Sequence, residues 1–284
     1  MKQLLPILLA AASHLVIAQS ASEIYLFDIN TTTLKLTNGT NITRHTGYDN
    51  QPFFHPTKPV LYYASFDGEG RSDIKFYDYQ AGKTNNLTST PEREYSPTPT
   101  PDGKYISCII QRDNGAQDLG KYPMEGGEAI VLIDDLIVGY HTWVNEKSLV
   151  LFVLGEPPTL RWYDLPTKTD SVLQSHIGRS LHKVPGKNAI SFVHKPAGEA
   201  WPIMQFDYNS RKVSTLVPTL PGREDLCWTP DGKILMSDGG KILVYDPKNP
   251  AAQWQVLAMD SNIREITRLA ISADGQKLAV VAAE

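Results

Sequence analysis

Short runs in which apolar and polar residues alternate, with turn-forming residues between them, occupy most of the chain. The clearest unit is Pro97–Ser107, in which a short strand is followed by the turn residues Asp102 and Gly103 and by a second strand. Asp-Gly suits a tight turn because Gly accepts a positive φ and Asp tolerates it. The pattern therefore predicts a β-hairpin.

This hairpin recurs along the chain. A close copy spans 226–236, and weaker copies lie at 54–58, 144–147, 184–187 and 272–275. The turns are anchored at 56, 101, 145, 185, 230 and 273, so consecutive anchors are 45, 44, 40, 45 and 43 residues apart. Self-similarity at a fixed period of this length indicates a repeat architecture.

A second signature, a β-type run that ends in an aromatic residue and Asp, lies between the anchors. It occurs at 24–28, 74–78, 160–164, 203–207 and 242–246, with a degenerate copy at 119–123. A polar turn and another β-type run follow, as at 84–88 and 212–216. Each period thus holds four strands, which is typical of a propeller blade of about 40 to 45 residues.

The phase of the repeat predicts how the ring closes. The chain begins with the third and fourth strands of a period, 24–28 and 33–37, and ends with the first and second, 267–272 and 277–282. Pairing them in one blade removes free sheet edges. We expect an all-β, six-bladed β-propeller with four antiparallel strands per blade, closed by its N-terminal and C-terminal strands. A β-sandwich with accidental similarity is the alternative.

The N-terminus predicts export. Lys2 precedes a short apolar run, and Val16 and Ala18 provide the small or aliphatic residues of a secretory cleavage site. The run is too short and interrupted for a membrane anchor, which needs about 20 apolar residues. We expect a signal peptide over 1–18, cleaved after Ala18, a single propeller domain over 19–284, and a periplasmic or secreted protein without a transmembrane segment.

The hairpin Pro101-Asp102-Gly103-Lys104, the aromatic-Asp strands and the blade ending Asn86-Leu87-Thr88 resemble those of TolB-type six-bladed β-propellers. The resemblance covers essentially the whole predicted mature chain. It implies the propeller domain only, without the α/β domain that precedes the propeller in TolB itself. These motifs are turn and strand residues, so they are specific for the fold and weak for function.

Composition and motifs narrow the function classes. The net charge of −4 argues against a nucleic-acid binder, which usually has a basic surface. Neither G-x-S-x-G nor H-E-x-x-H occurs, so the sequence offers no nucleophile elbow and no zincin site. We expect a monomer without a cofactor and, more readily than an enzyme, a binding protein. Cys108 and Cys227 fall on opposite blades, so both should be free, buried thiols.

The loops that lead into the innermost strands carry the candidate binding residues. Charged pairs recur at nearly the same repeat position, with looser equivalents in two further loops; the set is Arg93, Glu94, Arg223, Glu224, Arg264, Glu265, Arg179, Tyr48 and Asp49. In a propeller such loops crowd around one mouth of the central channel. They either clamp adjacent blades through mutual ion pairs or form a recognition surface for a protein or peptide.

A metal over the channel is the weaker possibility. His141 and His182 fall on innermost strands of neighbouring blades, but no carboxylate occupies a matching repeat position. We therefore predict no metal and no catalytic residue. The function expected is an exported, non-catalytic binding or assembly module of the periplasm or cell envelope. The alternative is a metal-dependent lyase or hydrolase that acts on an extracellular polymer at the channel mouth.

Overall fold

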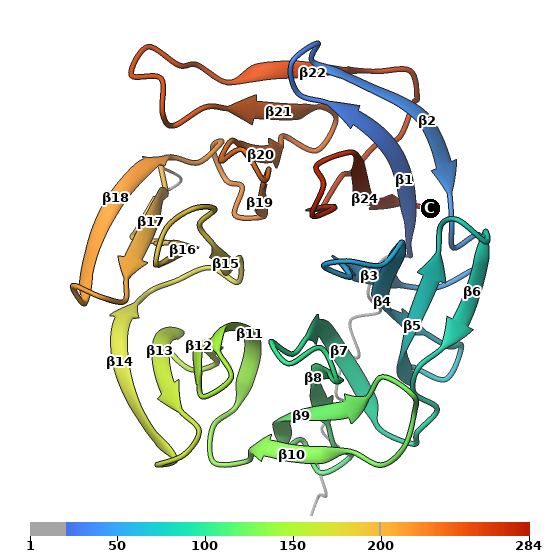
Figure 1. The fold of residues 1–284 in the computed structure, drawn as a ribbon, viewed down its shortest axis with the longest axis vertical. Helices are drawn as coiled ribbons and strands as arrows, with labels where there is room; N and C mark the ends of the chain where they lie inside the picture. The colour runs from blue at the N-terminus through green and yellow to red at the C-terminus, as the bar shows by residue number, and fades with distance from the viewer. Residues whose placement is uncertain (1–20, 199) are drawn as a thin grey trace, which may run out of the picture.

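The computed structural model describes residues 21–198 and 200–284, so the predicted signal peptide lies outside the described residues. In these residues the regular structure is entirely β, with 24 strands and no helix. The strands are arranged in a ring around a central opening (Figure 1). No helix in this part of the chain is long and apolar enough to cross a membrane.

The strands fall into four positions from the centre of the ring outward. The innermost are β3 (Asp49–Phe54), β7 (Arg93–Pro99), β11 (Val138–Asn145), β15 (His182–Lys183), β19 (Leu226–Trp228) and β23 (Arg268–Ile271). The second are β4 (Val60–Phe66), β8 (Tyr105–Gln111), β12 (Ser148–Val153), β16 (Ala189–Val193), β20 (Ile234–Ser237) and β24 (Lys277–Ala283). The third are β5 (Ser72–Asp78), β9 (Gln117–Pro123), β13 (Thr159–Asp164), β17 (Pro202–Asp207), β21 (Ile242–Tyr245) and β1 (Ser22–Asn30). The outermost are β6 (Lys83–Asn86), β10 (Ile130–Ile133), β14 (Thr169–Ser175), β18 (Lys212–Pro218), β22 (Gln255–Met259) and β2 (Lys35–Asn41).

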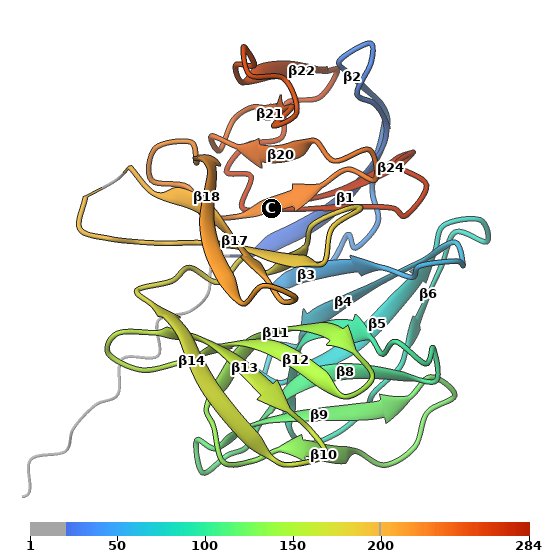
Figure 2. The ribbon, with the colours of Figure 1, turned by 60° about the vertical axis from the view of Figure 1, so that its left-hand side comes forward.

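Neighbouring positions pair in antiparallel register, as in the orders β11-β12-β13-β14 and β15-β16-β17-β18. In the turned view of Figure 2, β14 and β18 come forward. The first and last strands also pair: β1 lies between β2 and β24, with a register from Ser22 opposite Ala283 to Asp28 opposite Lys277. Segments from the two ends of the described chain therefore share one sheet.

The hairpin turns form where the repeat predicts them. In the turn between β7 and β8, Gly103 has a φ of 68° and its N–H donates to the Thr100 carbonyl at 2.9 Å. The Asp102 carboxylate accepts hydrogen bonds from the Thr100 hydroxyl at 2.6 Å and from the Lys104 N–H at 3.1 Å. The left-handed conformation is what favours Gly at this position.

The aromatic-Asp signature also has a local cause. Asp78, which ends β5, accepts the backbone N–H groups of Gln80 and Ala81, both at 2.9 Å. Asp207, which ends β17, does the same for the N–H groups of Asn209 and Ser210, at 3.1 and 2.7 Å. An Asp side chain that bonds the backbone two or three residues later stabilises a turn, so the residue marks the end of the third strand.

Buried hydrogen bonds join neighbouring sheets. The Trp143 indole N–H donates to the Ser107 hydroxyl at 2.8 Å, and Trp228 donates to Ser191 at the same distance. In both cases the Trp lies on an innermost strand and the Ser on the second strand of the preceding sheet. Each of these hydrogen bonds joins two neighbouring sheets and gives the buried indole N–H the acceptor that a buried polar group requires.

Cys108 and Cys227 are free and buried, as expected. They lie on β8 and β19, whose sheets are separated by those of β11–β14 and β15–β18. Burial raises the pKa of both thiols.

Candidate functional site

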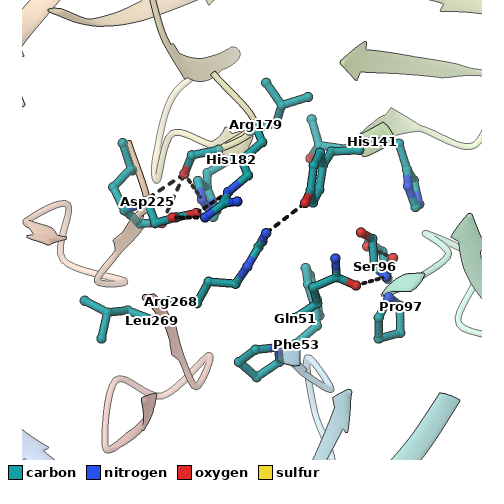
Figure 3. Close-up of a pocket in the computed structure, with 17 residues that line it drawn as sticks. Gln51, Phe53, Ser96, Pro97, His141, Arg179, His182, Asp225, Arg268 and Leu269 are labelled. Atoms are coloured by element: carbon teal, nitrogen blue, oxygen red, sulfur yellow. Dashed lines mark hydrogen bonds and ion pairs between the residues drawn. The ribbon is translucent and has the colours of Figure 1, made fainter. Parts of the chain in front are cut away.

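A small cavity of about 100 Å³ lies at the centre of the ring (Figure 3). All six innermost strands, or the residues just before them, contribute to it. One lining residue per repeat lies five positions before the turn anchor; these are Gln51, Ser96, Tyr140, Ser180, Asp225 and Arg268. The cavity therefore lies at the end of the channel where the loops enter the innermost strands, which we call the channel mouth.

Charged side chains occupy one side of the cavity. The Arg179 guanidinium pairs with Asp225 through two hydrogen bonds, Nη2 to Oδ2 at 2.6 Å and Nε to Oδ1 at 3.2 Å. Glu224 accepts the Arg179 backbone N–H at 3.0 Å and pairs with the Lys195 ammonium at 3.3 Å. These contacts join the sheet of β15 to the loop before β19. A forked Arg–carboxylate pair of this kind fixes both side chains geometrically.

Arg268 reaches into the cavity from the opposite side (Figure 3). Its Nη2 donates to the Tyr140 hydroxyl at 2.8 Å, and its guanidinium lies 5.1 Å from the centre of the same ring. Burial opposes the charge of Arg268, but Tyr140 and Asp225 outweigh that effect and raise its pKa. The side chain is therefore a cation held within the channel.

Two of the innermost strands, β3 and β7, are irregular where they meet the cavity. Gln51 and Ser96 have φ values of 58° and 54°, and the pairing registers of β3 and β7 shift at these residues. The Ser96 N–H donates to the Gln51 Oε1 at 2.7 Å. Such irregularities locally redirect side chains and are common next to functional sites.

The two candidate histidines both line the cavity but do not form a metal site. His141 Nε2 contacts the Ser107 hydroxyl at 2.7 Å, and His182 Nε2 contacts the Ser180 hydroxyl at 3.0 Å. Burial lowers the pKa of His141 to about 3 and that of His182 to about 4, so both rings are neutral at pH 7. Among the described residues, no group of three or more His, Cys, Asp or Glu side chains could hold a metal ion.

Comparisons with known proteins bear on the fold. A TolB protein of Agrobacterium tumefaciens matches with a TM-score of 0.69 at 14% identity, over 94% of this chain and 99% of that one. TolB of Acinetobacter baumannii matches with a TM-score of 0.57 at 17% identity, over 93% of this chain. The chain has a TolB-like β-propeller fold. It spans 64% of the length of the Acinetobacter protein.

This TolB-like fold is shared with proteins of other functions. An oligogalacturonate lyase in complex with manganese matches with a TM-score of 0.60 at 14% identity, over 87% of this chain and 80% of that one. No family model matches the sequence. A search of curated proteins found no match either. At these identities the similarity concerns the fold and not the chemistry.

In the three predicted Arg-Glu pairs, the arginine and the glutamate of one pair do not form an ion pair with each other. Arg93 donates to the Gly70 carbonyl at 3.0 Å and pairs with the exposed Asp113 at 3.3 Å. Glu94 is buried and accepts hydrogen bonds from the hydroxyls of Thr90 at 2.6 Å and Tyr122 at 2.9 Å. Burial raises the pKa of Glu94. It is therefore a structural carboxylate below the surface, whereas Arg93 is at the surface.

In the second and third pairs, Glu224 is partly buried and the other three residues are exposed. Arg223 is exposed and donates to the Asp238 carbonyl, while its neighbour Glu224 faces Arg179 and Lys195. Arg264 and Glu265 are exposed, and neither side chain makes a hydrogen bond or an ion pair within the described part of the chain. Contacts between sheets are thus made by Arg179 and by Arg93, which joins Gly70 to Asp113, and not by Arg223 or Arg264.

The Tyr48-Asp49 site is largely closed. Asp49 is fully buried, and its Oδ2 lies 3.3 Å from the His45 Nε2. Burial raises the pKa of Asp49 and also that of Tyr48, whose ring contacts Phe66 edge-on at 5.1 Å between centroids. Asp49 and Glu94 both precede their turn anchors by seven residues and share the same buried position. Neither carboxylate faces the cavity.

Of the nine predicted binding residues, only Arg179 lines the central cavity, beside the two candidate histidines. Sequence reasoning missed Tyr140, Asp225 and Arg268. A signal for them exists, because each lies five positions before a turn anchor. The Arg-Glu pairs in the loops indicated positions six to nine residues before the anchors, which the fold places outside the cavity.

Proposed function

We propose that this chain is an exported, non-catalytic TolB-like propeller that binds a protein or peptide partner at its channel mouth, in the periplasm or cell envelope. In this proposal residues 1–18 are removed and 19–284 form one monomeric domain, a six-bladed ring with four strands per blade. The pairing of β1 with β24 supports ring closure, because it leaves neither strand with a free edge.

The observation that carries the proposal is the convergence of six repeats on one cationic cavity. The six residues at the same repeat position include an amide, two hydroxyls, a phenol, a carboxylate and a guanidinium; they are Gln51, Ser96, Tyr140, Ser180, Asp225 and Arg268. A position with only a packing role would favour similar residues in each repeat. Exposed Arg223 and Arg264 extend the polar surface outward from the cavity. A rigid scaffold that presents varied polar side chains from convergent loops is typical of a binding site.

The second candidate, a metal-dependent lyase or hydrolase, has only the shared fold in its favour. It would need a ligand set near the channel, and the described residues offer no such group. His141 and His182 are each engaged by a serine hydroxyl instead.

Charge reversal at the mouth tests the binding proposal. Arg93, Arg223 and Arg264 are each changed to Glu in one variant, and the matched control reverses Lys104, Lys147 and Lys187, which are exposed in hairpin turns at the other end of the innermost strands. The two variants carry the same change in net charge. Solvated ion pairs contribute about 0–1 kcal/mol each, so both should melt close to the parent.

The readout is capture of partners from a native envelope fraction by immobilised protein, identified by mass spectrometry. We expect the mouth variant to lose a partner that the control variant retains. A stably folded mouth variant that captures the same partners as the parent would refute binding at this surface. If both variants lose the partner equally, the effect is one of net charge and the proposal is equally wrong.

A further inference from the structure

The two arginines of the central cavity are not equivalent. Arg179 is neutralised by its forked pair with Asp225. Arg268 makes no ion pair within the part of the chain that the structure describes, and its one side-chain hydrogen bond goes to the Tyr140 hydroxyl. A guanidinium has five N–H donors in a planar fork, so most of the hydrogen-bonding capacity of Arg268 is left for another group.

The cavity therefore carries an excess positive charge. Arg179 and Arg268 are cations, Asp225 is the carboxylate that lines the cavity with them, and His141 and His182 are neutral. Just outside the cavity, Glu224 pairs with Arg179 at 4.0 Å and with the Lys195 ammonium at 3.3 Å, so these three cations and two carboxylates together leave one excess positive charge. A cation enclosed in a protein is costly unless it is paired, which favours an anion at this position.

The lining of the cavity limits the anion. Pro52, Phe53 and Pro97 line the wall beside Arg268, and Phe53 is 40% exposed. A carboxylate on a short apolar stem fits this combination of one free guanidinium and an apolar wall.

We propose that the cavity binds one carboxylate group of an acidic peptide segment. This carboxylate pairs with Arg268, which has no counter-ion among the described residues. The inference rests on the proposed function and adds the chemical class of the ligand. Two features favour a peptide over a uronic-acid polymer: the single excess charge and the apolar wall. A side-chain or terminal carboxylate presents its charge on a short apolar stem, whereas a uronate ring carries its charge among hydroxyl groups.

The test uses small probes and the signals of the arginines themselves. The ¹⁵N-labelled protein is titrated with the peptide acetyl-Gly-Asp-Gly-amide, its Asn counterpart, digalacturonate and inorganic phosphate, while the Nε–Hε resonances of the arginines are followed by NMR. We expect the Asp peptide to shift the Arg268 resonance saturably, with an affinity on the order of millimolar, because a single charge-assisted contact binds weakly. The Asn peptide should have no such effect.

Two variants separate this site from general electrostatics. Arg268→Gln should weaken binding of the Asp peptide about tenfold or more, the loss expected for one hydrogen bond to a charged group. Arg161→Gln removes a guanidinium that is paired with Asp170 away from the channel, and should leave binding unchanged. If the Gln variant does not fold, Arg268→Lys replaces it; it should also weaken binding, although less, because the ammonium keeps the charge but lacks the planar fork of the guanidinium.

Three results would overturn the inference: no shift at Arg268 with the Asp peptide, equal loss in the Arg161 variant, or tighter binding of digalacturonate or phosphate than of the Asp peptide. None of these depends on capture of a natural partner. If the mouth variant still loses its partner while the probes fail, the binding function stands and only the carboxylate subsite is wrong.

Discussion

Arg268 and Tyr140 meet across the central channel, with the guanidinium donating to the phenol oxygen at 2.8 Å. The two residues are 128 positions apart in sequence and lie on β23 and β11, at equivalent positions of the repeat. Their contact either stabilises the ring or orients the guanidinium for a ligand. The two roles predict different losses in the free energy of unfolding when the contact is removed.

Replacement of Tyr140 by Phe separates these roles. The variant removes the hydroxyl and retains the ring, so the cation–π contact with Arg268 persists. Since Arg268 lies in a cavity where water can replace the hydroxyl, we expect a loss of only about 1 kcal/mol in the free energy of unfolding. Urea denaturation measures it. A loss of several kcal/mol would identify the contact as a structural brace.

Ser107 should matter more than its size suggests. Its hydroxyl accepts the Trp143 indole N–H at 2.8 Å and contacts His141 at 2.7 Å, and all three residues are buried. In Ser107→Ala both partners lose this contact, so we expect a destabilisation of about 2–3 kcal/mol.

Ser191→Ala is the matched control for this substitution. It removes the equivalent acceptor of Trp228 but no contact with a histidine ring, so it should cost less. The comparison is made by urea denaturation at pH 7. Equal losses in the two variants would show that the His141 contact contributes nothing.

His141 should make the fold sensitive to acid. Burial lowers its pKa in the folded state to about 3 from an ordinary value of 6.5, so below pH 6.5 the unfolded chain takes up a proton that the folded chain does not. Its contribution to stability therefore falls as the pH drops from about 6.5 toward 3, by about 2 kcal/mol between pH 7 and pH 5.

The measurement is the difference between the parent and His141→Gln in the pH dependence of the free energy of unfolding. The parent should lose about 2 kcal/mol more than the variant between pH 7 and pH 5. The same substitution at His176, which is exposed, is the control. Identical pH profiles for the parent and His141→Gln would contradict the buried, neutral state of His141.

The closing sheet can be tested by moving the ends of the chain. Deleting 267–284 removes β23 and β24 and exposes the edge of β1, so we expect aggregation or loss of cooperative unfolding.

The control is a circular permutant that joins Glu284 to Ala21 and opens in the turn at 80–82, so it keeps every strand. Its new joint is short, because the Glu284 N–H lies 3.4 Å from the Ala21 carbonyl oxygen. The permutant should melt cooperatively; a truncated protein that stays soluble and melts like the parent would refute closure.

Much of the fold could be predicted from local signals. Asp102 and Gly103 mark a turn because their own conformational preferences require one, and their recurrence gives the spacing of the repeat. Asp78 and Asp207 mark the ends of third strands because their carboxylates bond the turns that follow. These signals act within a few residues of one another, so they can be recognised without the tertiary structure.

The site was less predictable because it depends on contacts between repeats. Arg268 and Tyr140 are ordinary strand residues until the ring brings them together. The positive φ of Gln51 and Ser96 redirects the innermost strands β3 and β7, and neither Gln nor Ser is a residue type that predicts a positive φ. The charged pairs were visible as a recurring motif, but Glu94 is buried among hydroxyl groups and only Arg179 lines the cavity.

Site-specific photo-crosslinking in cells that produce the protein naturally tests the central claim most directly, that a partner binds at the channel mouth. In one variant a photoreactive residue replaces Arg264, which is exposed at the channel mouth. In a second variant it replaces Lys147, which is exposed in the turn between β11 and β12 at the other end of the channel. We predict a discrete covalent adduct from position 264 on illumination and none from position 147. The same adduct from position 147, or no adduct from position 264 in a correctly folded protein, would contradict the account.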